Sequence, residues 1–166
     1  MSSTENASVE AIVKALALTP HPEGGFYRET FRSPLVLDGL PHGAPRNAST
    51  AIYYLLPGGA TSAFHHVRSD EIWHHYAGDP LELHTIDTRG EHAQIALGSS
   101  LANGERPQHV VPAGVLQGAF ARGRYSLCGC TVAPGFDFAD WVLPSREELC
   151  AQFPAHRALI QLLTRR

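Results

Sequence analysis

The sequence predicts an all-β protein with short helices at its N- and C-terminal ends. Fifteen Gly and twelve Pro imply many turns and therefore many short elements. Between residues 25 and 142 the turn signals recur about every eight to twelve residues, a spacing typical of a β-sandwich or barrel. Helical periodicity is confined to the two ends of the chain, which argues against an alternating parallel α/β sheet.

The N-terminal segment is predicted to form a helix. Ser8 is placed to cap its start. The run at 20–25 ends it, because two prolines and two glycines cannot continue a helix. The apolar residues after the cap recur at spacings of three and four: Val9, Ile12, Val13 and Leu16.

A series of β-strands is predicted after this helix. The segment 49–56 is rich in β-branched and aromatic residues and stops at the turn 57–59. Alternating residues flank a turn at 87–90, which is typical of a hairpin. The expected strands are 25–32, 34–38, 49–56, 62–67, 71–76, 81–87, 91–97, 108–111, 116–121, 125–133 and 138–142.

Two short helices are predicted at the C-terminal end. Ser145 and Glu148 have the spacing of a capping box. The pair Phe153-Pro154 interrupts the first helix, and residues 156–163 form the second, with an apolar stripe on one face. We expect this stripe to pack on the outside of the sheet, with a dimer contact as the alternative.

Length and composition narrow the function classes. The 166 residues suit a single domain, 1–166. A net charge of -3 argues against the basic surface of a nucleic-acid-binding protein. No apolar run reaches the roughly eighteen residues of a membrane helix, and residues 1–10 lack the pattern of a secretion signal. Three Cys are too few for a disulfide framework, so we expect reduced thiols and a cytoplasmic protein. From the net charge and the lack of a long apolar run we expect no nucleic-acid or membrane partners.

Histidine is the compositional outlier, and its distribution points to a site. Six of the ten histidines lie in one stretch of 28 residues, and imidazole is a common metal ligand and proton carrier near neutral pH. In this stretch Gly59 is followed by five residues and His65, three residues separate Val67 from Glu71, and six separate Glu71 from Gly78. Side chains two apart project from one face of a strand, so such spacing gathers groups in one place.

This block, together with the segment 112–117, resembles the two signature motifs of the cupin superfamily, G-x5-H-x-H-x3-E-x6-G and P-x-G-x2-H. The resemblance implies that side chains from neighbouring strands converge inside a small barrel and form a pocket for a small-molecule ligand. His65 is the residue that the motif position marks most strongly.

The chain differs from these motifs at two ligand positions. Val67 stands where the second His belongs, and Gln117 stands where the third belongs. His66 does not replace Val67, because it points to the opposite face of the strand. The resemblance therefore leaves His65, Glu71 and Gln117 as candidate ligands of a divalent metal ion, whereas first-row metals in proteins usually have three or four good ligands.

The resemblance extends over residues 12–163, to an uncharacterised bacterial and fungal branch of the cupins. It implies a cupin-type double-stranded β-helix, or jelly roll, and a homodimer, and it assigns no reaction. The segments that carry it are 18–32, 49–55, 70–74, 78–81 and 132–137.

The segment 23–29 is also similar to a stretch of the cupins that epimerise nucleotide-linked deoxysugars. Those enzymes are metal-free and use a His base and a Tyr acid. The likeness implies His65 as the base and Tyr53 or Tyr54 as the acid, with Glu71 orienting the imidazole.

Further residues are expected to bind a substrate. An Arg familiar from the epimerase motif is replaced here by Glu23, while several arginines remain for an anionic substrate: Arg28, Arg32 and Arg46. Trp73 and His75 share their strand face with Glu71, although Trp73 is equally suited to core packing. The expected substrate-binding set is Phe26, Arg28, Trp73, His75 and Gln117.

Three functions remain open at this point. The first is an isomerase or epimerase that acts on a sugar-like or keto substrate through proton abstraction by His65. The second is a ligand-binding cupin without catalysis. The third is a metal-dependent oxygenase or hydrolase, against which the residues at positions 67 and 117 count.

Overall fold

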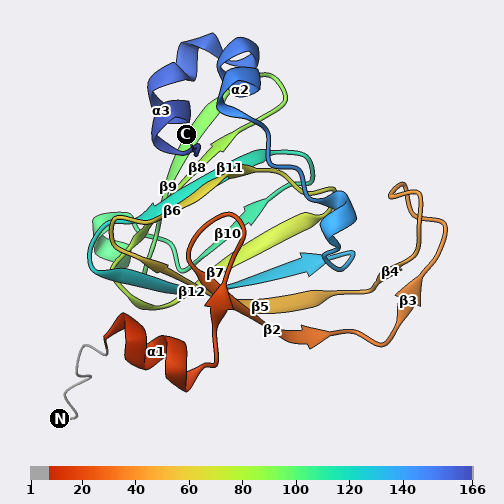
Figure 1. Cartoon of the computed structure of the whole chain (residues 1–166), viewed down its shortest axis with the longest axis horizontal. Coiled ribbons are helices and arrows are strands. Elements are labelled where there is room, and N and C mark those ends of the chain that lie inside the picture. Colours follow the sequence, from red (N-terminus) through yellow and green to blue (C-terminus); the bar gives the residue numbers. More distant parts are fainter. Residues whose placement is uncertain (1–7, 166) are drawn as a thin grey trace.

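The strands of the computed structural model form two main antiparallel sheets that face each other (Figure 1). Structure is described for residues 8–165. The larger sheet has the strand order β1-β2-β5-β12-β7-β10, the smaller has the order β6-β11-β8-β9, and the ribbon β3-β4 extends away from the sandwich. This arrangement confirms the predicted all-β class. The bounds are Thr19–Pro20 (β1), Phe26–Arg32 (β2), Val36–Leu37 (β3), Arg46–Asn47 (β4), Thr50–Pro57 (β5), Thr61–His65 (β6), Asp70–Gly78 (β7), Leu81–Ile86 (β8), His92–Leu97 (β9), Gln108–Val111 (β10), Leu116–Ala121 (β11) and Tyr125–Ala133 (β12).

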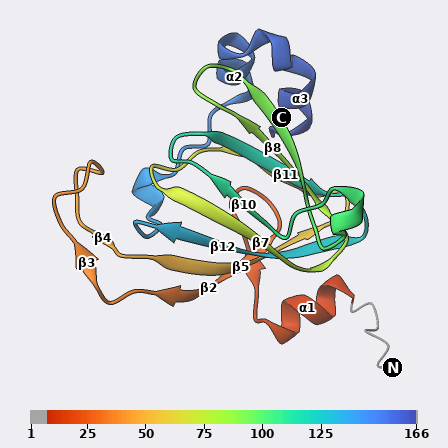
Figure 2. The same ribbon diagram turned by 180° about the vertical axis from the view of Figure 1, so that it is seen from behind.

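Short helices lie at both ends of the described chain, as predicted. Helix α1 packs on the larger sheet, and the C-terminal helices cover the smaller one (Figures 1 and 2). Ile160 and Leu163 of the predicted apolar stripe are buried against Phe64 and Ile86, so the stripe packs on the sheet of its own chain. The helical segments are Val9–Ala15 (α1), Leu101–Asn103 (η1), Phe138–Asp140 (η2), Arg146–Gln152 (α2), Pro154–His156 (η3) and Arg157–Leu162 (α3).

Side-chain caps begin two of these helices at the predicted residues. The Ala11 amide donates to Ser8 Oγ at 3.2 Å. Ser145 and Glu148 form the complete capping box of α2. Each cap satisfies amide groups that have no partner within the helix itself.

The strand predicted at 138–142 is wrong, because its first half is the short helix η2. The Ala139 amide donates to the Asp137 side chain at 2.8 Å, and the Asp140 amide donates to the Asp137 carbonyl oxygen at 2.9 Å. These local bonds offer the backbone an alternative to sheet pairing. The expected strand 34–38 shrinks to the two residues of β3, and the short strands β1 and β4 are additions to the predicted set.

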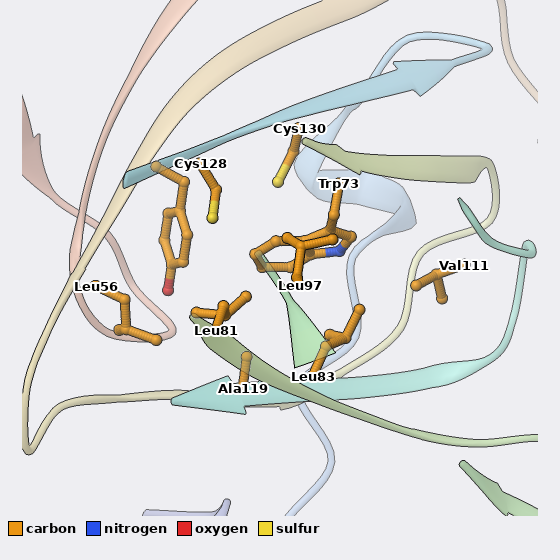
Figure 3. Packing of buried hydrophobic residues seen from close by; sticks show 10 residues of the cluster. Leu56, Trp73, Leu81, Leu83, Leu97, Val111, Ala119, Cys128 and Cys130 are labelled. Carbon is orange, nitrogen blue, oxygen red and sulfur yellow. The ribbon is translucent and has the colours of Figure 1, made fainter. Parts of the chain in front are cut away.

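The main core lies between the two sheets (Figure 3). Trp73 projects from β7 into its centre, where leucines of the smaller sheet and the thiols of β12 surround it. Cys128 and Cys130 are free and buried, as expected for small apolar side chains, and burial raises the pKa of the Cys128 thiol to about 12. The cluster consists of Tyr54, Leu56, Trp73, Leu81, Leu83, Leu97, Val111, Ala119, Cys128 and Cys130.

A tight turn at residues 21–25 presses the chain against β6. Gly24 has φ of 119° and Gly25 has φ of 71°, both in the region that favours glycine. A Cβ atom at Gly24 would collide with the Thr61 carbonyl oxygen. The Ala63 amide donates to the Glu23 carbonyl oxygen at 3.0 Å. The turn therefore fixes Glu23 beside the end of β6, which carries His65.

Gly24→Ala is expected to lower the free energy of unfolding by about 3 kcal/mol or more, because it combines a strained φ with a backbone collision. Gly39→Ala is the matched control, since Gly39 also has a positive φ but open space around its Cβ position, and it should cost about 1 kcal/mol. Urea unfolding followed by circular dichroism measures both. Equal losses in the two variants would contradict the close contact between the turn and β6.

Candidate functional site

A cavity of about 390 Å³ opens between the inward faces of five strands, β2, β5, β6, β7 and β12, and two flanking segments, 17–23 and 136–141. Its volume lies at the lower end of the range for small-molecule pockets. The two-residue repeat of a β-strand explains this lining. Thr50, Ile52 and Tyr54 occupy every second position of β5, so their side chains project from the same face into the cavity. Three of the expected catalytic residues, Tyr54, His65 and Glu71, line the cavity.

His65 is buried and held by two hydrogen-bond acceptors on one ring nitrogen. Its Nδ1 lies 2.8 Å from the Ala63 carbonyl oxygen and 3.1 Å from Glu23 Oε2. A carbonyl oxygen only accepts, so Nδ1 carries the proton. In the neutral ring Nε2 then keeps its lone pair. A base with one fixed nitrogen and one free nitrogen is the arrangement that proton abstraction requires.

Glu23 is the site residue that the sequence analysis missed. Only 6% of it is exposed, and its Oε1 accepts a hydrogen bond from Ser62 Oγ at 2.9 Å. The backbone amide of Glu23 donates to His21 Nδ1 at 3.1 Å. The available signal was a carboxylate in a turn with two glycines, but its contact with His65 spans 42 positions and follows no periodicity.

Glu71 ends a chain of buried hydrogen bonds. Gln117 Nε2 donates to Glu71 Oε2 at 2.6 Å, and Trp73 Nε1 donates to Gln117 Oε1 at 2.7 Å. Burial raises the pKa of Glu71 and outweighs the opposing effect of His65. Gln117 and Trp73 therefore position Glu71 from behind, and neither of them lines the cavity.

Of the two expected tyrosine acids, only Tyr54 faces the cavity. Its hydroxyl donates to the Gly24 carbonyl oxygen at 2.7 Å, and burial raises its pKa well above the ordinary value. Tyr53 lies on the opposite face of β5, where its ring packs edge-on against Tyr76 at 6.3 Å. The Tyr54 proton is thus engaged with the backbone, and Tyr53 is remote from His65.

Of the other expected substrate-binding residues, Phe26 and His75 lie outside the cavity lining, and Arg28 only borders it. Phe26 packs with the cluster under α1, because β2 turns it away from the cavity. The Arg28 guanidinium carbon is 5.7 Å from the centre of the Tyr53 ring, on the same outer face, although Arg28 borders the cavity. His75 lies beyond Trp73 along β7, and its Nε2 lies 3.2 Å from the Asp79 carbonyl oxygen.

The expected metal ligands do not form a donor set that fits a divalent ion. Val67 lines the cavity at the second histidine position, and valine offers no donor atom. The oxygen of Gln117 accepts from Trp73, and its amide points its protons at Glu71. Among residues 8–165 no three His, Cys, Asp or Glu side chains are grouped as a metal site.

The comparisons with known proteins give the family. Residues 10–144 match the family model described as Cupin superfamily (DUF985). The chain belongs to this cupin family. It is 30% identical over 148 residues to the uncharacterised protein YML079W of Saccharomyces cerevisiae. This match covers 81% of this chain and 74% of the yeast protein. Membership confirms both the resemblance and the predicted jelly roll.

Two solved structures are similar to this cupin over nearly its whole length. A protein from Shewanella oneidensis is 41% identical, with a TM-score of 0.89 over 96% of this chain and 98% of its own. A hypothetical protein from Leishmania major is 34% identical, with a TM-score of 0.90 over 96% of this chain and 100% of its own. In the described part of this cupin, no helix has the length and apolar character needed to cross a membrane.

Glu71→Gln is expected to make this cupin more stable at neutral pH. The raised pKa of Glu71 means that the folded state holds its proton more tightly than the unfolded state. The stability that protonated Glu71 contributes to the folded state is therefore fully present below about pH 4. It is lost as the pH rises through the pKa of Glu71 in the folded state. The amide keeps an oxygen for Gln117 and carries no charge at any pH.

Urea unfolding at several pH values between acid and neutral measures this difference. The advantage of Glu71→Gln over the wild type should shrink to nothing as the pH falls. Glu91→Gln, which removes an exposed carboxylate on the β8–β9 hairpin, is the control. An advantage that grows on acidification would contradict the raised pKa.

Proposed function

We propose that this cupin is an isomerase or epimerase that moves a proton beside the carbonyl group of a small molecule, with His65 as the general base. The observation that carries the proposal is the buried contact of His65 Nδ1 with the Ala63 carbonyl and the Glu23 carboxylate. That contact favours the tautomer with a lone pair on Nε2 and stabilises the imidazolium that forms when the proton is taken.

In the proposed step, Nε2 of His65 takes a proton from the carbon next to the carbonyl. The electron pair of the broken C–H bond moves toward the carbonyl oxygen, which becomes an enolate oxygen. Glu23 balances the new charge on the imidazolium across 3.1 Å. Transfer of this proton from His65 to the neighbouring carbon, which bears a hydroxyl group, completes isomerisation. In epimerisation a water molecule delivers a proton to the original carbon from the opposite face, and His65 releases its proton to solvent.

Glu71 supplies the proton for the enolate oxygen in this proposal. Burial raises its pKa, which favours the protonated carboxyl that an acid needs. Gln117 holds the carboxyl in place at 2.6 Å. Tyr54 is assigned to shaping the cavity, since its hydroxyl proton is given to the Gly24 carbonyl.

Deuterium exchange tests the proposal. The protein is incubated in D2O with free aldoses, ketoses and keto acids, and proton NMR follows loss of the C–H signal beside the carbonyl. His65→Asn should slow exchange by about 100-fold or more, the usual range for a lost general base. His66→Asn is the matched control, because His66 neighbours His65 on the opposite face of its segment and does not line the cavity.

Equal exchange in the wild type and in His65→Asn would contradict the assignment of the base. Binding without exchange over the whole panel would favour the ligand-binding alternative, in which the same cavity holds a small molecule unchanged.

The homodimer implied by the family resemblance remains a prediction. Light scattering after gel filtration should give twice the 18.0 kDa mass of one chain. A single species at the mass of one chain would contradict it.

A further inference from the structure

The charged groups that line the cavity are mostly acidic. Four acidic side chains border it, Glu23, Glu29, Glu71 and Asp137, of which Glu29 is paired with the lining Arg32 at 2.8 Å and Glu71 is the protonated group of the proposed function. The two lining imidazoles do not balance this charge, because His21 accepts the Glu23 amide at Nδ1 and burial lowers its pKa, while His65 already faces Glu23. An anionic ligand would therefore meet the carboxylates of Glu23 and Asp137, and like charges brought together in an interface are unfavourable.

None of the three arginines that the sequence offers to an anion presents a free guanidinium to the cavity. Arg32 lines the cavity, but its guanidinium donates to both Glu29 oxygens, at 2.8 and 2.9 Å, to Asn47 Oδ1 and to the Phe136 carbonyl oxygen. Arg46 is paired with Asp140 at 2.7 Å, away from the lining.

Arg28 is directed to the other face of the larger sheet, over Tyr53. The cavity therefore lacks a free arginine that could bind the anionic substrate expected from the sequence.

The mouth of the cavity is aromatic. Phe136 and Phe138 pack edge-to-face at 5.0 Å, and Phe138 and Trp141 do so at 5.8 Å. Phe138 is 50% exposed, so much of its ring is free to contact a ligand. Tyr27 and Tyr54 add two further rings deeper in the lining. Aromatic faces pack against the C–H face of a ring-shaped polyol, while carboxylates accept its hydroxyl protons.

We infer that the cavity takes an uncharged, polyhydroxylated carbonyl compound of the size of a free monosaccharide. Phosphorylated and nucleotide-linked sugars are excluded by the same lining. The carbonyl group of this ligand rests on the proposed function. Its lack of charge and its polyhydroxylated ring rest on the lining charges, the engaged arginines and the aromatic mouth. The volume of about 390 Å³ suits a single sugar ring.

Calorimetric titration and saturation-transfer NMR of the full chain test this inference. The probes are free pentoses and hexoses, each with its terminal phosphate ester, and glucosamine with glucose as a matched amine pair. At least one free sugar should bind. Its phosphate ester should bind about tenfold more weakly or worse, because the dianion meets the carboxylates of Glu23 and Asp137 and no cation that is free to pair with it.

Glu29→Gln sharpens the test. It removes the partner that holds the Arg32 guanidinium, so the phosphate ester should gain about tenfold relative to the free sugar through pairing with the released arginine. Glu91→Gln removes the same charge outside the lining and should leave the ratio of the two affinities unchanged.

Three results would overturn the inference: a phosphate ester that binds as well as its free sugar, an amine that binds better than its neutral partner, or no binding by any free sugar. These results are separate from failure of the proposed function. A free sugar that binds but shows no His65-dependent exchange refutes the isomerase and leaves the ligand class standing. Exchange on a phosphate ester alone refutes the ligand class and leaves the isomerase standing.

Discussion

The contact between Glu23 and His65 is the interaction on which the candidate site depends. It joins a turn near the N-terminal end to the last residue of β6, and both side chains are almost completely buried. A buried carboxylate is costly unless it is paired, and a buried histidine needs a partner for its N–H group. Each group satisfies the other, and Ser62 satisfies the second carboxylate oxygen. The remaining nitrogen of His65 has no hydrogen-bond partner among the described residues.

The side of the cavity that carries Glu71 is arranged differently from the metal site of the signature motif. In the signature motif, positions 65, 67, 71 and 117 would supply four metal ligands. Here Val67 removes one donor, and Gln117 turns both of its polar atoms to other protein groups. The hydrogen bonds from Trp73 through Gln117 hold the Glu71 carboxyl in place, and burial raises its pKa. The same jelly-roll positions thus agree with the acid–base chemistry that we propose.

Strand parity explains which site residues the sequence could place and which it could not. His65 and Glu71 follow from motif spacing, and both line the cavity. Tyr53 and Tyr54 are adjacent, so only one of them can face inward, and the choice depends on the sheet that β5 joins. Phe26 and Arg28 alternate with Tyr27 on β2 and therefore face away together. The error at 138–142 came from a local cap by Asp137, which apolar periodicity does not reveal.

The sequence by itself determined the class of fold, the capped helices, the family and the two chemical groups that meet in the cavity, because those depend on local spacing. The tertiary structure alone decided that Glu23 reaches His65, that Gln117 holds Glu71, and that Arg46 pairs with Asp140. These contacts join residues far apart in the chain. They depend on strand order and register, which no local pattern of residues encodes.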